Sequence, residues 1–413
     1  MDKVRKYILP VLFFVLPFAI ISRGYLHEGK EGFIHAGQIF SFTLFVLIII
    51  AAQIKNIPLA ALLVYAALWQ GAIFIKSMAG PVDPQSIIDG LNTIIFLIIG
   101  GSLYLAIVNS KTETRMFYDV ICLSAIAQLI VGYLQWTLGF DLVRSAFGLF
   151  VDARTKLSPS TPTGILGNPN YLAAYLAFST FFFCRGFKLR WHGFRGFKLP
   201  YSPFRWWVTL PFIAVMLYAT QTSTAVIALG AGAFVYWFVL LKRGVITRKA
   251  FWGTSAAGLA VVIWYAFFYH SIIRPIGNQG GDLQRLDMWI SVWQDMTSSW
   301  QHFVFGFGPG APWARPYTLH SEWVTVARQL GLFGIVLMAG YAFTIFRHGL
   351  DTPPALLASA VVIFVNMMGN SALHFALSAF LIIIVLGLIE REGGRVVADT
   401  TPEKGYRPRP GIK

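Results

Sequence analysis

The sequence predicts an all-α polytopic membrane protein, and three observations lead to this fold class: composition, apolar segments and the distribution of charge. Of the 413 residues, 56% are hydrophobic and only 12% are charged, whereas about 25% of the residues in a soluble domain are charged. Runs of about 20 apolar residues recur from end to end, as helices that cross a ~30 Å hydrocarbon layer require. A chain of this composition needs lipid as its main solvent.

The apolar runs predict about twelve transmembrane helices with both termini in the cytoplasm. The first run follows a basic N-terminus and has no small-residue cleavage site, so we interpret it as a retained anchor. The spans form one domain, residues 1–389, and the Pro-, Gly- and charge-rich residues 390–413 are expected to be a disordered cytoplasmic tail. The predicted spans are residues 7–22, 34–52, 58–75, 87–108, 117–138, 169–184, 206–220, 223–241, 251–269, 331–346, 355–370 and 372–389.

Charged residues divide unequally between the two sides of this topology. The cytoplasmic side receives 23 of the 33 Lys and Arg and 8 of the 18 Asp and Glu, so it carries the whole net charge of +15. This asymmetry follows the positive-inside rule and predicts a multi-pass inner (plasma) membrane protein. The loop 185–205 interleaves aromatic and basic residues, which could suggest RNA binding, but contact with anionic lipid headgroups explains it more simply.

Ionisable residues gather in two long outer loops, residues 139–168 and 270–330, and the larger of these joins spans nine and ten. The spans are nearly free of charge, whereas coupled transporters and proton pumps usually have intramembrane carboxylates or paired charges. No internal repeat relates the two halves of the chain, which also argues against a transporter. The pattern favours an enzyme that works at the outer membrane surface.

Two residues of the larger loop are the main candidates for catalysis. Arg285 opens an amphipathic stretch, and its guanidinium offers a fork of donors that matches phosphate oxygens. His320 leads into span ten, and a histidine can accept a proton from an attacking hydroxyl. The alternatives are structural: Arg285 could pair with Asp282 or Asp287, and His320 could be a hydrogen-bonded residue of the membrane interface.

Two further segments combine turn residues with polar ones. The segment GFGPG (306–310) is expected first of all to form a turn, because glycine adopts backbone shapes that other residues resist; a phosphate cradle is the alternative. Asn168 and Asn170 flank a proline, which predicts a helix N-cap at the start of span six, with a polar rim of an active site as the alternative. Arg154 and Lys156 lie just upstream and could attract a diphosphate.

Three segments match one known family in order and spacing. Residues 163–173 (TGILGNPNYLA) are similar to its G-x-x-x-N-P-N-x-x-A motif. Residues 285–289 followed by 306–310 are similar to its R-x-x-x-W…G-x-G-x-G block, and residues 320–334 (HSEWVTVARQLGLFG) to its H-[NS]-x-[aromatic]-L…G-x-x-G motif. Over roughly residues 160–390, the chain therefore resembles the O-antigen ligase and polymerase superfamily of bacterial envelope glycosyltransferases.

This resemblance implies an enzyme that moves a glycan from undecaprenyl diphosphate to an acceptor hydroxyl at the periplasmic face of the bacterial inner membrane. In an O-antigen ligase of lipopolysaccharide biosynthesis the acceptor is lipid A-core. The family uses no metal, cofactor or nucleotide sugar. By position, His320 would be the base and Arg285 would hold the diphosphate, and direct displacement would invert the anomeric centre. Four residues are expected at the site rim: Asn168, Asn170, Glu322 and Trp289.

One departure from the family concerns a second arginine for the diphosphate. The family often has a Ser-Arg pair at the start of the eighth span, whereas residues 220–224 (TQTST) contain no arginine and Thr224 stands in its place. The second arginine must then come from elsewhere. The candidates are Arg154, Arg274, Arg315 and Arg328.

Other functions fit parts of the same pattern. A polymerase would extend one lipid-linked chain with another, and a protein O-oligosaccharyltransferase would glycosylate a Ser or Thr of a protein. We favour a ligase or polymerase, because no separate soluble domain that could bind a protein acceptor is predicted. A flippase for lipid-linked oligosaccharides could also have twelve spans, but it would need charged residues in a central cavity and no outer-loop histidine.

Overall fold

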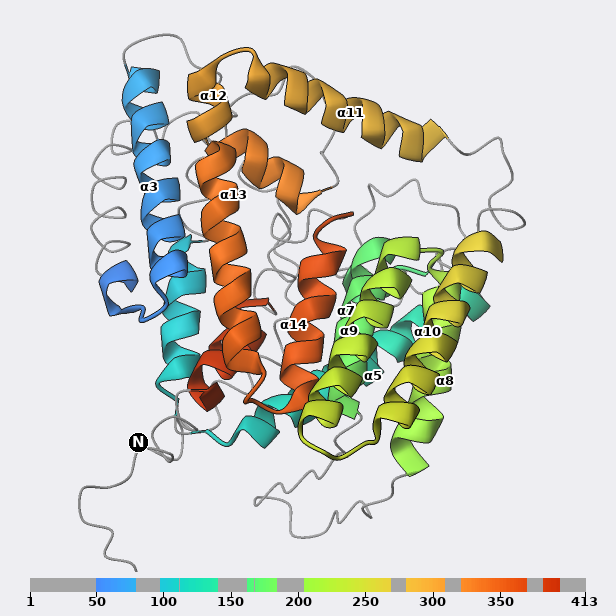
Figure 1. Ribbon diagram of the computed structural model, residues 1–413. Coiled ribbons are helices and arrows are strands. Elements are labelled where there is room, and N and C mark those ends of the chain that lie inside the picture. The colour runs from blue at the N-terminus through green and yellow to red at the C-terminus, as the bar shows by residue number, and fades with distance from the viewer. Residues whose placement is uncertain are drawn as a thin grey trace, which may run out of the picture.

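Helices form most of the described part of the computed structural model (Figure 1). It describes residues 50–78, 97–110, 112–139, 162–166, 168–183, 204–268, 280–308, 321–369 and 382–393, and no strand occurs among them. The all-α prediction is confirmed for this part of the chain. The physical reason is that an apolar segment in lipid has to satisfy its backbone hydrogen bonds within itself.

Helices succeed one another through the described segments of the chain. Segments 97–108 and 382–393 are also helical. The labelled elements are α3 (Ile57–Met78), α5 (Thr114–Leu138), the 3-10 turn η4 (Gly164–Leu166), α7 (Pro169–Phe183), α8 (Phe204–Ala219), α9 (Ser223–Lys242), α10 (Arg248–Phe268), α11 (Gly280–Thr297), α12 (Trp300–Phe305), α13 (Glu322–Gly349) and α14 (Pro354–Asn366).

Three of these helices, α5, α9 and α13, are long and apolar enough to cross a membrane. The shortest of them, α9, has 20 residues, and at ~1.5 Å per residue it matches a ~30 Å hydrocarbon layer. Their length and composition support a membrane protein. The predicted span 7–22 and nearly all of span 34–52 lie outside the described residues.

The core lies where α7, α9 and α14 pack together. Leu172 and Leu176 on α7 and Leu356 on α14 are fully buried. Gly232 of α9 lies so close to α7 and α14 that an added Cβ would be 2.8 Å from the Phe181 ring. Small residues allow this close approach of helices in lipid. A hydrogen bond from the Ser359 hydroxyl to the carbonyl oxygen of Phe178 (2.9 Å) also joins α14 to α7.

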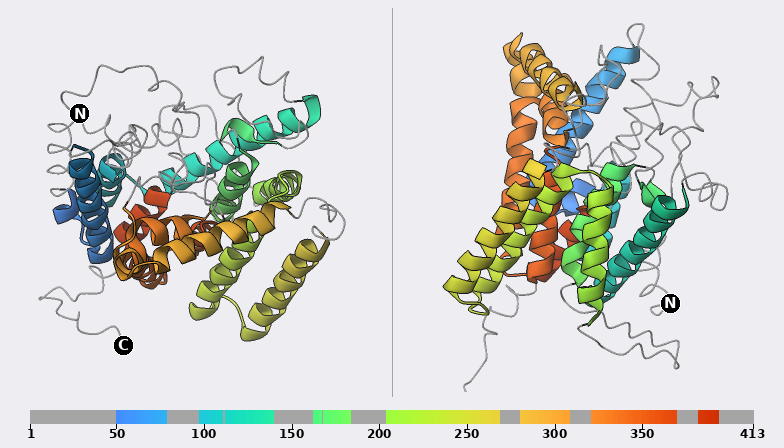
Figure 2. Two further views of the ribbon diagram at one scale, coloured as in Figure 1. Left: turned by 90° about the horizontal axis from the view of Figure 1, so that it is seen from above. Right: turned by 90° about the vertical axis from the view of Figure 1, so that its right-hand side faces the viewer.

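The helix α10 lies at the edge of the bundle and packs mainly against α9 (Figure 2). Its large apolar side chains, among them Trp252, Leu259 and Trp264, are mostly exposed. In a membrane protein such a face is suited to contact with hydrocarbon.

The predicted outer loop 270–330 contains two helices and the beginning of a third. The amphipathic stretch expected from Arg285 to Met296 is helical and belongs to α11, which crosses one end of the bundle above α12 and α13 (Figure 1). The prediction started span ten at Gly331, but α13 begins at Glu322 and kinks at Gly331. Apolar periodicity marked only the part after the kink, because the first nine residues of α13 are more polar.

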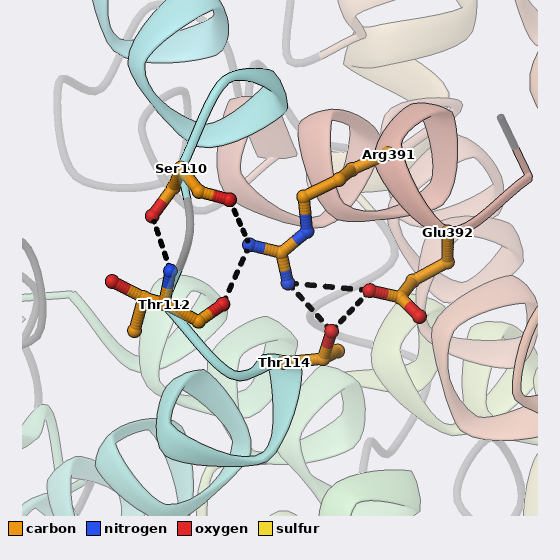
Figure 3. Close-up of polar contacts among 5 residues, drawn as sticks. All are labelled: Ser110, Thr112, Thr114, Arg391 and Glu392. Carbon is orange, nitrogen blue, oxygen red and sulfur yellow. Dashed lines mark hydrogen bonds and ion pairs between the residues drawn. The ribbon is translucent and has the colours of Figure 1, made fainter. Parts of the chain in front are cut away.

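At the opposite end, Arg391 joins the last helical segment to the start of α5 (Figure 3). Its guanidinium donates hydrogen bonds to the carbonyl oxygens of Thr112 (3.0 Å) and Ser110 (3.5 Å), and it pairs with Glu392 (3.3 Å). The Arg391 side chain is buried. Helix 382–393 therefore continues four residues past the predicted domain boundary at residue 389, and residues 394–413 lie outside the described part.

Candidate functional site

The backbone joins α12 to α13 at the point where two of the predicted motif segments meet. The amide of Phe307 donates to the carbonyl oxygen of Arg328 (2.8 Å), and the amide of Gly308 donates to that of Gln329 (2.8 Å). These residues are about 20 positions apart in the sequence. The segments 306–308 and 328–331 therefore form one unit, which we call the α12–α13 junction.

Two glycines make this junction possible. Gly306 (φ 79°, ψ −171°) and Gly331 (φ 66°, ψ −163°) both adopt a backbone region that is open essentially only to glycine. A Cβ on Gly306 would lie 2.5 Å from the carbonyl oxygen of Gln329, and a Cβ on Gly331 would lie 2.5 Å from the amide nitrogen of Gly306. The turn predicted for Gly306 and Gly308 is confirmed, and its backbone lies in close contact with residues 328–331 of α13.

Aromatic and cationic side chains cover this junction. The Arg328 guanidinium lies over the Phe307 ring, 5.3 Å from its centroid, and the His302 imidazole stacks on the same ring at 4.0 Å. Asp295 of α11 exerts a favourable charge interaction on Arg328. Arg328 is only 8% exposed, and its guanidinium packs the start of α13 against the Phe307 ring of the 306–308 turn.

A second polar cluster forms where α7 begins. The Asn168 side-chain oxygen accepts a hydrogen bond from the amide of Asn170 (2.8 Å), and α7 starts at Pro169. This confirms the predicted N-cap with proline in the first turn. The side-chain oxygen of Asn170 accepts a hydrogen bond from the Thr222 hydroxyl (3.0 Å). The start of α7 is thereby joined to the start of α9.

The turn before α7 is held by Gln135, which the sequence did not single out. The Gln135 side-chain oxygen accepts from the amides of Thr163 (2.9 Å) and Gly164 (2.8 Å), and its nitrogen donates to the Gly164 carbonyl (3.0 Å). Gln135 is 2% exposed. A glutamine inside a largely apolar span was the available signal, because a buried amide in a membrane helix needs polar partners.

Close contacts connect these two polar regions around the end of α14. Gly369, just after α14, touches Thr224 of α9 so closely that a Cβ there would overlap the threonine side chain. On the other side, the amide of Glu322 donates to the carbonyl oxygen of Met367 (2.8 Å). The starts of α7, α9 and α13 and the end of α14 therefore lie together at one end of the bundle, the end that α11 crosses (Figure 1).

The predicted site residues fall into two groups. Arg328, Glu322, Asn168, Asn170 and Trp289 are described: Glu322 is buried at the start of α13, whereas the two asparagines and Trp289 are half-buried. Arg285 belongs to α11, but its side chain lies outside the described residues. The other candidates also lie outside them: His320, Arg154, Arg274 and Arg315.

No protein-family model matches the chain, and no match was found among curated proteins. At the end of the bundle that α11 crosses, the amide and hydroxyl groups of Asn168, Asn170 and Thr222 are hydrogen-bonded to one another, and the Arg328 guanidinium packs on the Phe307 ring.

Proposed function

We propose that the protein is an inverting glycosyltransferase that moves a glycan from undecaprenyl diphosphate to an acceptor hydroxyl, as an O-antigen ligase does with lipid A-core. In this proposal the chain has about twelve spans with both termini in the cytoplasm. The end of the bundle that α11 crosses faces the periplasm of a bacterial inner membrane. The described residues at the opposite end include Lys242, Arg243, Arg347 and Arg391, which suits a cytoplasmic side.

The observation that carries the proposal is the α12–α13 junction. Its two backbone hydrogen bonds bring the GFG turn of one motif segment against the RQLG sequence of another. The third segment, around Asn168 and Asn170, begins α7 at the same end of the bundle. The described parts of the segments that resemble three motifs of one catalytic family thus lie at the same end of the bundle, which supports a shared active site.

The proposed mechanism is direct displacement at the anomeric carbon. His320 takes the proton of the acceptor hydroxyl as the oxygen attacks, and the diphosphate leaves with the electrons of the broken glycosidic bond. The Arg285 guanidinium stabilises the negative charge that develops on the leaving group, an effect that is largest where water is excluded. Because attack and departure occur in one step on opposite faces of the sugar, the anomeric configuration is inverted.

The test is glycan transfer by the purified protein in proteoliposomes that contain an undecaprenyl-diphosphate-linked glycan and lipid A-core. Wild-type protein should form glycosylated lipid A-core with inverted configuration. The His320→Ala variant should lose roughly 10²–10⁴-fold in rate, which is the usual contribution of a positioned base. The Arg285→Ala variant should lose roughly 10²–10³-fold, the usual contribution of one group that stabilises charge in the transition state. His348→Ala and Arg347→Ala, which alter the far end of α13, serve as matched controls and should retain the wild-type rate.

Each other outcome has a distinct meaning. Wild-type rates in both His320→Ala and Arg285→Ala would refute the site. A product with retained configuration would refute the one-step displacement. Movement of the lipid-linked glycan across the bilayer without any transfer would refute the enzyme proposal in favour of a flippase. Growth of the lipid-linked chain itself would identify a polymerase with the same chemistry.

A further inference from the structure

Tyr65 of α3 contacts the α12–α13 junction although it belongs to none of the motif segments. Its hydroxyl donates to the carbonyl oxygen of Phe305 (3.0 Å), with a longer contact to that of Leu330 (3.4 Å). The Tyr65 ring packs edge-on against Phe333 at 4.9 Å and 77°. One side chain thus touches the last residue of α12 and both sides of the kink in α13.

The Tyr65 hydroxyl provides a hydrogen-bond partner for the end of the helical segment 322–330. The kink at Gly331 interrupts α13, so the last carbonyl groups of segment 322–330 need partners from outside the helix. The carbonyl oxygens of Arg328 and Gln329 accept from the amides of Phe307 and Gly308. The next carbonyl, that of Leu330, is the one that faces the Tyr65 hydroxyl.

We propose that Tyr65 is a positioning residue of the active site. It holds the α12–α13 junction against α3 and thereby fixes the segment 322–330, which follows His320 in the sequence after the single residue Ser321. This inference rests on the proposed function for its effect on transfer, but its effect on the junction does not depend on that function. The Tyr65 hydroxyl takes no part in the chemistry; it keeps the reacting groups in register, where small displacements are costly for rate.

The experiment compares Tyr65→Phe with a matched control, Tyr133→Phe. Tyr133 of α5 donates to the carbonyl oxygen of Phe212 on α8 at 3.0 Å and packs edge-on against that ring at 5.6 Å and 82°. Each variant therefore loses one hydroxyl that donates to a backbone carbonyl of another helix and keeps its aromatic pair. Only the Tyr65→Phe change affects the α12–α13 junction.

The first readout is amide hydrogen exchange of the full-length protein in lipid nanodiscs. In Tyr65→Phe, exchange at the amides of Phe307 and Gly308 should accelerate several-fold, because their hydrogen bonds to α13 open more often. Exchange in α5 and α8 should stay unchanged. In Tyr133→Phe, exchange in α5 and α8 should accelerate, and exchange at Phe307 and Gly308 should stay unchanged. Phe333→Leu, which loosens the Tyr65 ring and keeps the hydroxyl, should give a smaller acceleration at the same two amides.

The second readout is steady-state transfer with the lipid-linked donor. Tyr65→Phe should lower kcat about tenfold, the scale of one lost hydrogen bond, and change the donor KM less than about twofold. Tyr133→Phe should leave both constants unchanged. Unaltered exchange at Phe307 and Gly308 would overturn the proposal, and so would faster exchange with an unaltered kcat. If the wild-type protein transfers no glycan, the proposed function fails, and the exchange measurement still decides whether Tyr65 holds the junction.

Discussion

Replacing Gly331 by alanine tests how much of the stability of the molecule depends on the α12–α13 junction. The φ of 66° and ψ of −163° at this position are open essentially only to glycine, so an alanine would be strained by roughly 1–3 kcal/mol. Its Cβ would also lie 2.5 Å from the Gly306 amide nitrogen. The segments 306–308 and 328–331 would have to separate, and the hydrogen bonds of Phe307 and Gly308 contribute about 1 kcal/mol each.

The expected loss for Gly331→Ala is therefore about 3–5 kcal/mol in the free energy of unfolding. It can be measured by reversible denaturation in mixed micelles, followed by circular dichroism. Gly253→Ala and Gly258→Ala in α10 are matched controls, because a Cβ on either glycine would meet no atom within 4 Å. These controls should be neutral or up to ~1 kcal/mol more stable. A Gly331→Ala protein as stable as the wild type would refute this account of the kink.

Two further substitutions test other parts of the structure. Arg391→Met should lower the free energy of unfolding by about 2–4 kcal/mol, because it leaves buried carbonyl oxygens without their charged donor. The control is Arg243→Met, at an exposed arginine that also bonds to carbonyl oxygens, and it should lower the free energy of unfolding clearly less. Equal losses in the two variants would contradict the role of burial. Arg328→Lys keeps the charge but not the planar group above Phe307, so it should cost about 1 kcal/mol of stability with little change in the donor KM. A large rise in KM at unchanged stability would instead show that Arg328 contacts the donor phosphates.

Parts of the candidate site were accessible from the sequence because they depend on local chemistry. The N-cap at Asn168 follows from an asparagine and a proline at a helix start, and the turn at Gly306 and Gly308 follows from the conformational freedom of glycine. Gln135 and Tyr65 were not accessible in this way. Each acts on residues that are close in space and far away in the chain, and neither belongs to a motif.

The sequence by itself determined that this is an all-α membrane protein, because the solvation of apolar residues and of the backbone in lipid leaves few alternatives. It also determined where helices such as α7 begin, since capping involves only neighbouring residues. Only the tertiary structure decided that α13 extends nine residues beyond its apolar part, that Gly306 and Gly331 press against each other, and that Tyr65 bonds to the junction. The physical reason is that these features depend on distances between segments that packing brings together, and no local pattern encodes those distances.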